Sequence, residues 1–109
     1  MVQLILRMAV GSGRTAEIVR ALRSLMLPLE AAPGFISCRL YVEAGCPDSL
    51  YYVEEWRTTE DVDRQICSNH CTRLLCLMEE AVEPPDLRLH WVTETRGLEY
   101  LESVRSCGG

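Results

Sequence analysis

The sequence predicts an α+β domain in which one antiparallel sheet of four strands has two helices on a single face. Four segments alternate between apolar and polar residues, which is the pattern of a strand with one buried side. Two longer segments repeat apolar residues every three or four positions, as a helix with one buried stripe does. Their order along the chain, strand-helix-strand-strand-helix-strand, is the ferredoxin-like arrangement.

The first half of the chain is expected to form a strand, a helix and a second strand. Residues 2–10 alternate between aliphatic and mixed positions, which predicts a strand. A helix is expected over 14–29, where one apolar stripe recurs, with Ser12 as its N-terminal cap. A proline and a glycine then end this helix, and residues 35–43 alternate again as the second strand.

The second half is expected to add a strand, a helix and a last strand. Residues 50–57 alternate as the third strand. A long helix is expected over 58–82, with hydroxyl and carboxylate side chains in its first turn and a bend near 68–69. Two prolines end this helix, and residues 86–95 form the predicted fourth strand.

Residues 1–96 are therefore predicted to form one domain, and residues 97–109 a C-terminal tail. A chain of 109 residues suits a single domain with a substantial core. Within the tail, residues 98–104 are expected to form a short helix, and the Gly-Gly pair at 108–109 a frayed end. The sequence assigns no role to this tail.

The charge and hydrophobicity of the chain argue against two classes of partner. Acidic residues outnumber basic ones by 16 to 11, for a net charge of −5, so no basic surface for nucleic acid is expected. The apolar opening at 1–10 is interrupted by Arg7 and is too short to span a membrane or to act as an export signal. We therefore expect a cytoplasmic protein whose six cysteines are thiols, although their even number also permits three disulfides.

The predicted arrangement leaves one face of the sheet without helices. This outer face is expected to present Tyr41, Tyr52 and Trp56 together with several charged groups. An exposed face with so many aromatic side chains usually meets a partner, and most oligomers are symmetric. A homodimer that pairs these faces is therefore predicted.

The stretch ICSNHCTRLLC at 66–76 gathers cysteine and histidine on the second helix. Cys67, His70 and Cys71 fall within one arc of that helix, on its apolar stripe, and Cys76 points away. The order C-x-x-H-C is not the haem-attachment motif, in which the histidine comes last. A zinc site needs further ligands that the sequence does not require, so packed thiols are favoured over a metal centred on Cys67 and Cys71.

Three stretches also resemble a known family. The segment at 14–43 is similar to that family's first helix, Pro-Gly turn and second strand. YYVEEWRTTEDV at 51–62 is similar to its E-x-W strand end and second helix, and SNH at 68–70 stands where members often have Ser-Pro-His. The family is that of the antibiotic biosynthesis monooxygenases, small dimeric α/β-barrel proteins, and the resemblance covers about 2–95.

The resemblance implies a fold and a choice of activities. It implies a ferredoxin-like monomer whose sheet pairs with a second copy into a barrel, with a pocket between sheet and helices or at the barrel mouth. Characterised relatives oxidise aromatic polyketide or quinol substrates with O₂ and without metal or flavin, and others degrade haem. The haem-degrading residues are replaced here by Leu75, Gln65 and Arg7, so haem degradation is not expected.

The oxygenase activity assigns candidate roles to seven residues. His70 is the expected base and Arg88 the expected oxyanion-stabilising group, as catalytic residues. The expected substrate-binding residues are Trp56, Tyr52, Glu54, Tyr41 and Arg39.

Structural roles compete with four of these assignments. Trp56 also suits a core or interface position, and His70 a backbone hydrogen bond at the helix bend. Glu54 also suits an ion pair at the dimer seam, and Arg88 an ordinary edge-strand position.

The sequence thus favours a cofactor-independent monooxygenase that acts on a small aromatic substrate, with no metal or cofactor. The alternative is a non-catalytic ligand-binding or dimerisation module of the same fold.

Overall fold

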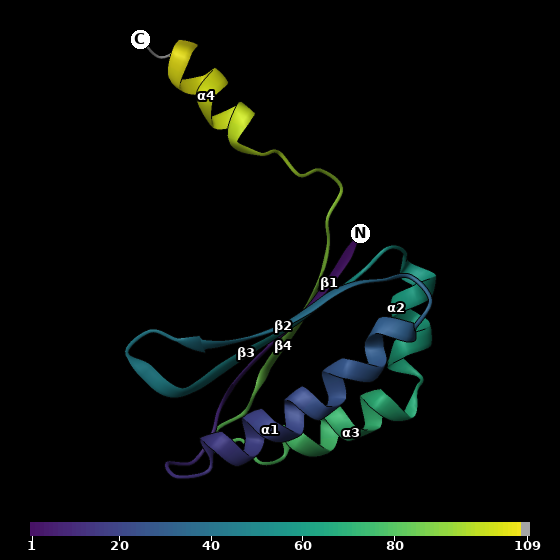
Figure 1. The fold of residues 1–109 in the computed structure, drawn as a ribbon, viewed down its shortest axis with the longest axis vertical. Helices are drawn as coiled ribbons and strands as arrows, with labels where there is room; N and C mark the ends of the chain where they lie inside the picture. The colour runs from purple at the N-terminus through teal and green to yellow at the C-terminus, as the bar shows by residue number, and fades with distance from the viewer. Residues whose placement is uncertain (108–109) are drawn as a thin grey trace.

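The strands and helices follow the order that the sequence predicts (Figure 1). The computed structural model describes residues 1–107, so the frayed end predicted at 108–109 lies outside the described residues. In chain order the elements are β1 (Val2–Ala9), α1 (Thr15–Met26), the 3₁₀ helix η1 (Leu27–Ala31), β2 (Phe35–Glu43), β3 (Cys46–Trp56), α2 (Thr59–Ile66), α3 (Asn69–Met78), β4 (Asp86–Trp91) and α4 (Leu98–Cys107).

The four strands form one antiparallel sheet in the order β2-β3-β1-β4. Helices α1, α2 and α3 lie together on one face of this sheet, as Figure 1 shows. The predicted α+β, ferredoxin-like fold is confirmed. The barrel made by two copies stays a prediction.

The core lies between the sheet and the helices. The even-numbered residues of β1 point toward the helices, and each is at most 4% exposed. Leu4, Leu6 and Met8 belong to one cluster with Ile18 and Leu22 of α1 and Leu74 of α3, and Val2 belongs to a second cluster with Trp56. Burying an aliphatic side chain of this size contributes about 1.5–3 kcal/mol. The alternation of the strand and the stripe of each helix therefore determine which faces meet.

Ser68 divides the long second helix that the sequence predicts. Its backbone is extended (φ −88°, ψ 162°), and its hydroxyl accepts a hydrogen bond from the amide of Cys71, at 3.4 Å. Ser68 is thus the N-cap of α3, whereas α2 ends at Ile66. The prediction of one helix over 58–82 is wrong, because this cap makes the expected bend a complete break.

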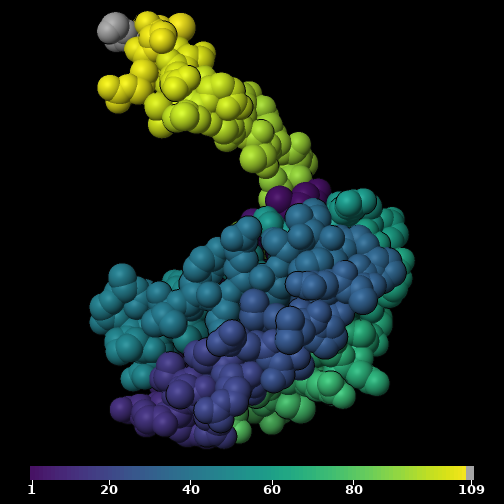
Figure 2. Space-filling view, in the orientation of Figure 1, coloured from purple at the N-terminus to yellow at the C-terminus, as the bar shows by residue number. Residues whose placement is uncertain are grey.

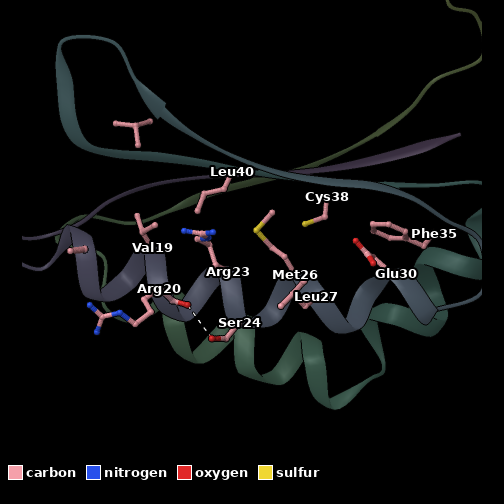
Figure 3. A pocket seen from close by; sticks show the side chains of 12 residues that line it. Val19, Arg20, Arg23, Ser24, Met26, Leu27, Glu30, Phe35, Cys38 and Leu40 are labelled. Atoms are coloured by element: carbon pink, nitrogen blue, oxygen red, sulfur yellow. Dashed lines mark hydrogen bonds between the residues drawn. The ribbon is translucent and has the colours of Figure 1, made fainter.

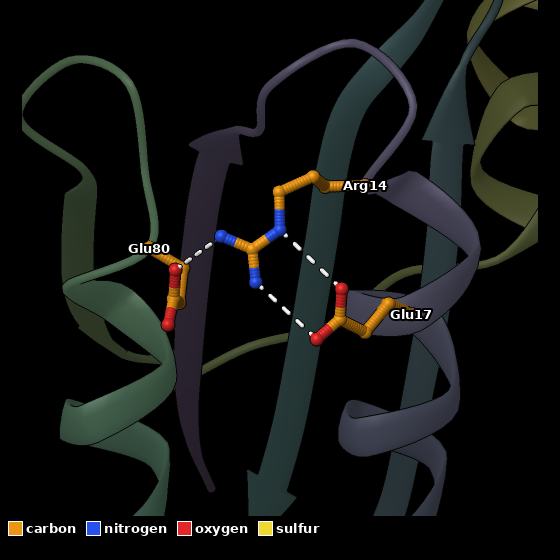
Figure 4. A network of polar contacts seen from close by, with 3 residues as sticks. All are labelled: Arg14, Glu17 and Glu80. Atoms are coloured by element: carbon orange, nitrogen blue, oxygen red, sulfur yellow. Dashed lines mark hydrogen bonds and ion pairs between the residues drawn. The ribbon is translucent and has the colours of Figure 1, made fainter.

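The first helix begins without the cap predicted at Ser12. Arg14 occupies the N-cap position, and its side chain makes no capping hydrogen bond. Its guanidinium instead lies between Glu17, at 3.3 Å, and Glu80, at 2.7 Å, and so joins α1 to the end of α3 (Figure 4). These groups are exposed, so each pair contributes at most about 1 kcal/mol.

A β-bulge decides which side chains of β2 face inward. The register with β3 shifts between Phe35 and Ser37, so Phe35 turns inward and Ile36 is left 44% exposed. The Phe35 ring meets the ring of Trp56 edge-on, with centroids 5.8 Å apart.

The aromatic content of the outer face differs from the prediction. Trp56 and Tyr52 are 0% and 1% exposed and face the helices, so their expected placement on the outer face is wrong. The physical reason is register: on β1, Val2 lies opposite Trp56 and Leu6 opposite Tyr52, and both are core residues. Tyr41 does lie on the outer face, where it is 51% exposed.

The fourth strand is shorter than predicted, and the tail leaves the body directly after it. The Val92 amide donates to the Met1 carbonyl at 2.8 Å, and beyond this bond the neighbouring strand has ended. Figure 2 shows the chain after Val92 leading away from the body to α4. Every residue of α4 is exposed. The tail helix predicted at 98–104 is present and extends to Cys107.

Among residues 1–107, no helix has the length and hydrophobicity that crossing a membrane requires.

Candidate functional site

A buried carboxylate lies at the centre of the candidate site. Glu54 is 1% exposed on the helix-facing side of β3, where the strand period of two places Tyr52 and Trp56 beside it. The Tyr52 hydroxyl donates to Oε2 of Glu54 at 2.6 Å, and the Trp56 indole donates to Oε1 at 2.9 Å. Within residues 1–107 no cationic side chain forms an ion pair with Glu54.

Cys38 extends this hydrogen-bonded group onto the next strand. It lies opposite Glu54 in the register of β2 with β3. Burial raises the pKa of the Cys38 thiol to about 11, and the Glu54 charge acts in the same direction. Burial, followed by the charge of Glu54, also raises the pKa of Tyr52 far above its ordinary value. Both groups therefore keep their protons at neutral pH.

The direction of the hydrogen bonds follows from this protonation. The Tyr52 hydroxyl proton is directed at Glu54, at 2.6 Å, and Cys38 lies beside the same hydroxyl. Cys38, Tyr52 and Glu54 thus form a row of neighbouring polar groups that ends at a carboxylate.

A small cavity lies on the other side of Glu54. It has a volume of about 10 Å³, close to that of one water molecule, and is lined by Leu4, Glu54, Val62, Gln65, Ile66, His70, Cys71 and Leu74. Two of its polar atoms, Gln65 Nε2 and His70 Nδ1, are buried and have no hydrogen-bond partner within residues 1–107.

The backbone of α1 determines the protonation of the His70 ring. His70 Nε2 lies 2.7 Å from the carbonyl oxygen of Leu25, which can only accept a hydrogen bond. Nε2 therefore holds a proton, and in the neutral ring Nδ1 is the nitrogen with a free lone pair. Nδ1 is buried without a hydrogen-bond partner among residues 1–107, and His70 lines the cavity beside Glu54.

A larger groove lies between α1 and the edge strand β2 (Figure 3). Its volume of about 880 Å³ is within the range of small-molecule sites. The residues that line it are Ala16, Val19, Arg20, Arg23, Ser24, Met26, Leu27, Glu30, Phe35, Cys38, Leu40 and Val42. Most of these are apolar, and Arg20, Arg23 and Glu30 supply the charges. Because Cys38 lines the groove and also contacts Tyr52, it connects the groove to the buried carboxylate.

The sheet separates the seven residues selected from the sequence into two groups. Trp56, Tyr52, Glu54 and His70 lie on the helix-facing side. The register places Arg39, Tyr41 and Arg88 on the outer face. The two predicted catalytic residues are therefore not brought together within one chain.

Arg88 has a local partner on its own strand. Its guanidinium lies 3.2 Å from the carboxylate of Asp86, and the Arg88 side chain is 68% exposed. An exposed pair of this kind holds the side chain only weakly.

Three functional candidates were not selected from the sequence. Arg20 and Arg23 lie away from the apolar stripe of α1, a position that is typical of solvent-facing residues. Their spacing of three beside the apolar Val19 and Met26 is the signal that places them along a groove. Gln65 has no such signal, since a buried amide looks like a surface residue in a sequence.

The cysteine cluster of α2 and α3 does not assemble a metal site. Among residues 1–107, no group of three or more His, Cys, Asp and Glu side chains is placed to share a metal ion. All six cysteines, Cys67 and Cys71 included, are free thiols.

The family assignment rests on the segment that contains most of this site. The model of the antibiotic biosynthesis monooxygenase family matches residues 1–73, which include both walls of the groove, Glu54 and His70. The chain belongs to the antibiotic biosynthesis monooxygenase family. The resemblance drawn from the sequence is confirmed. Among proteins of curated function, none shows significant sequence similarity to the chain.

Solved structures share the fold over most of the chain. Rv0793 from Mycobacterium tuberculosis superposes with a TM-score of 0.76 at 20% identity, and the match covers 88% of this chain and 98% of Rv0793. SnoaB, a cofactor-independent oxygenase from Streptomyces nogalater, gives a TM-score of 0.74 at 18% identity and covers 86% of this chain and 94% of its own. A conserved protein from Methanosarcina mazei gives 0.74 at 21% identity, with coverage of 82% and 89%. These superpositions show a common fold.

Proposed function

We propose that this member of the family is a cofactor-independent monooxygenase that oxidises a small, flat aromatic substrate of the quinol or polyketide type with O₂. The observation that supports it most is the groove of about 880 Å³, whose lining includes Cys38, a neighbour of the buried pair Tyr52 and Glu54. A family neighbour by fold, SnoaB, is itself a cofactor-independent oxygenase.

The proposed reaction begins with removal of a proton from the bound phenol. The substrate hydroxyl gives its proton to Cys38 as the thiol proton passes to Tyr52 and the Tyr52 proton passes to Glu54. His70 Nδ1, across the small cavity, is the base that returns Glu54 to its charged form. Arg20 and Arg23 stabilise the negative charge left on the substrate oxygen.

The remaining steps need only O₂. The deprotonated ring transfers one electron to O₂, and the carbon radical and superoxide combine, with a proton, into a hydroperoxide. Loss of water from this hydroperoxide leaves a carbonyl, so one oxygen atom enters the product and the other leaves as water. In this scheme Trp56 is a positioning residue, because its indole holds Glu54 and does not reach the groove.

We further propose that the protein is a homodimer that pairs the outer faces of its sheets. Arg39, Tyr41 and Arg88 then lie inside the barrel, where they are available to a substrate that enters from its mouth. Their proposed roles in binding and charge stabilisation belong to that assembled state.

One observation favours the alternative of a non-catalytic ligand-binding module. Tyr52, Glu54 and Trp56 satisfy one another and are at most 1% exposed, as in a purely structural network. In that case the groove binds a ligand that leaves unchanged.

Oxygen uptake by metal-stripped protein, measured with a panel of aromatic quinols and anthrone-type substrates, distinguishes the oxygenase from the binding module. The oxygenase predicts uptake above the uncatalysed rate, and uptake at least about tenfold lower in Glu54→Gln, which lacks the proton acceptor, and in Tyr52→Phe, which lacks the hydroxyl that passes the proton to it. Tyr51→Phe, on the outer face and without a proposed role, is the matched control. Saturable binding of the same compounds to the groove without uptake supports the binding module instead.

A further inference from the structure

The small cavity between the sheet and the helices α2 and α3 is lined by two side chains whose polar atoms lack a partner. Gln65 is 9% exposed, and its Nε2 makes no hydrogen bond to any residue among 1–107. The same is true of Nδ1 of His70. Both side chains line the cavity together with Glu54. Because buried polar groups are almost always hydrogen-bonded, to protein or to ordered water, two such atoms at one cavity indicate a bound molecule.

The break between α2 and α3 is what brings these two side chains to one cavity. In a continuous helix, residues five positions apart lie about 140° apart around the axis, so Gln65 and His70 would face different ways. Ser68 holds the break, since its hydroxyl donates to the Gln65 carbonyl at 2.6 Å. His70 is held in turn by the Leu25 carbonyl, at 2.7 Å.

The size of the cavity limits the molecule that it can hold. Its volume of about 10 Å³ is at the lower limit for one water molecule. A larger molecule would have to displace Val62 or Leu74, which line the cavity and are buried in the core.

The hydrogen-bonding character of the three polar side chains identifies the molecule. Gln65 Nε2 can only donate, whereas His70 Nδ1 accepts, because Nε2 of that ring holds the proton. A carboxylate accepts about four hydrogen bonds, and Tyr52 and Trp56 supply two of those that Glu54 can accept. The occupant must therefore accept one hydrogen bond and donate two. Water does both, whereas a metal cation cannot accept and a halide ion cannot donate.

We propose that a water molecule bound in this cavity accepts a hydrogen bond from Gln65 and donates to Glu54 and His70. Its role rests on the proposed function: after each deprotonation of substrate, it carries the proton from Glu54 to His70. The protonated Glu54 gives its proton to the water oxygen as the water gives one of its own protons to His70 Nδ1, so the water is regenerated and His70 becomes a cation. Gln65 is a positioning residue, because its amide holds the water oxygen and directs both water hydrogens at acceptors.

A crystal structure of the full chain, at a resolution that shows ordered waters, tests the site without substrate. One water is expected within about 2.5–3.2 Å of a Glu54 oxygen, Gln65 Nε2 and His70 Nδ1. A direct contact between Gln65 and His70, or a cavity without density, overturns the proposal.

Removing the amide tests whether Gln65 holds the water. Gln65→Met, which keeps the length of the side chain, is expected to lose the water from its crystal structure. Gln3→Met is the matched control, because the Gln3 amide donates to Glu55 at 2.8 Å on the other face of the sheet. This control is expected to keep the water. A water that persists in Gln65→Met contradicts the positioning role.

Steady-state oxygen uptake tests the transfer of the proton. Gln65→Met is expected to lower kcat at least about tenfold, because each turnover must return Glu54 to its charged form. KM is expected to change less than about twofold, since Gln65 does not line the groove. Gln3→Met should leave both constants unchanged. An unchanged kcat in Gln65→Met, or a change in KM alone, overturns the role of the water in the reaction.

The two measurements separate this inference from the proposed function. A water at the three side chains of a protein that takes up no oxygen supports the binding site and removes the oxygenase. Uptake by the native chain, with no water in the cavity of its crystal structure, removes the bound water and leaves the oxygenase.

Discussion

Glu54 is the residue on which the proposed chemistry most depends, because its carboxylate is buried with two donors and, among residues 1–107, with no ion-pair partner. Removing one donor leaves an oxygen without a partner in the core. We expect Tyr52→Phe to lower the free energy of unfolding by about 1.5–3 kcal/mol, as for other hydrogen bonds to buried charges. Urea denaturation measures it, with the exposed Tyr41→Phe as a control expected to change by less than about 0.5 kcal/mol. Equal effects of the two variants contradict a charged Glu54 in need of both donors.

The raised pKa of Cys38 predicts a loss of stability at alkaline pH. The thiol ionises near its ordinary value of 9.0 in the unfolded chain and near 11 in the folded one. Between these values the folded state holds more protons, so the free energy of unfolding falls as pH rises through this window. The raised pKa of Tyr52 acts in the same direction.

Urea midpoints measured under reducing conditions at about pH 8 and about pH 10.5 test this loss. The midpoint of the native chain should fall between them, and that of Cys38→Ala should fall less, because this variant lacks one of the two groups. A steeper fall in Cys38→Ala contradicts the assignment.

For single residues, the sequence predicted which side chains share one side of a strand better than it predicted whether that side faces the helices. The alternation of β3 correctly placed Tyr52, Glu54 and Trp56 on one side of the strand. It did not say which side, because a carboxylate within the pattern resembles a solvent-facing residue. Only the pairing with β1, where Leu4 lies opposite Glu54, decides the direction, and that pairing depends on residues about 50 positions apart.

Among the elements, the break between α2 and α3 matters most for the site, because it directs His70 toward α1. We expect Ser68→Ala to destabilise the protein by about 0.5–2 kcal/mol, since α3 loses its cap. Thermal or urea denaturation measures the change. Ser12→Ala is the matched control, because Ser12 precedes a helix that it does not cap. An equal loss in both variants contradicts the observed capping.

The elements themselves were largely predictable, and their ends were not. Apolar periodicity located all four strands and both helical regions. The cap at Ser68 was missed because serine is acceptable inside a helix as well as before one, and only the extended backbone distinguishes the two. The end of β4 at Trp91 was missed because it depends on where the neighbouring strand β1 begins.

For the whole molecule, the outer face of the sheet points to an assembly of two copies. The last prediction concerns the face. Val53 lies on it, on an interior strand of the sheet, so a charge there opposes pairing of two sheets while the monomer tolerates it. Sedimentation equilibrium should give twice the chain mass of 12.3 kDa for the native protein and a shift toward the monomer for Val53→Asp.

Ile66→Asp provides the control for this experiment. Ile66 is 43% exposed at the end of α2, on the helix side of the sheet, so the substitution adds the same charge away from the proposed seam. The dimer should persist in this variant. If both variants dissociate, the loss reflects general destabilisation or charge, and if neither does, the sheets do not meet through this face. Dissociation of Val53→Asp alone supports pairing of the two sheets through this face.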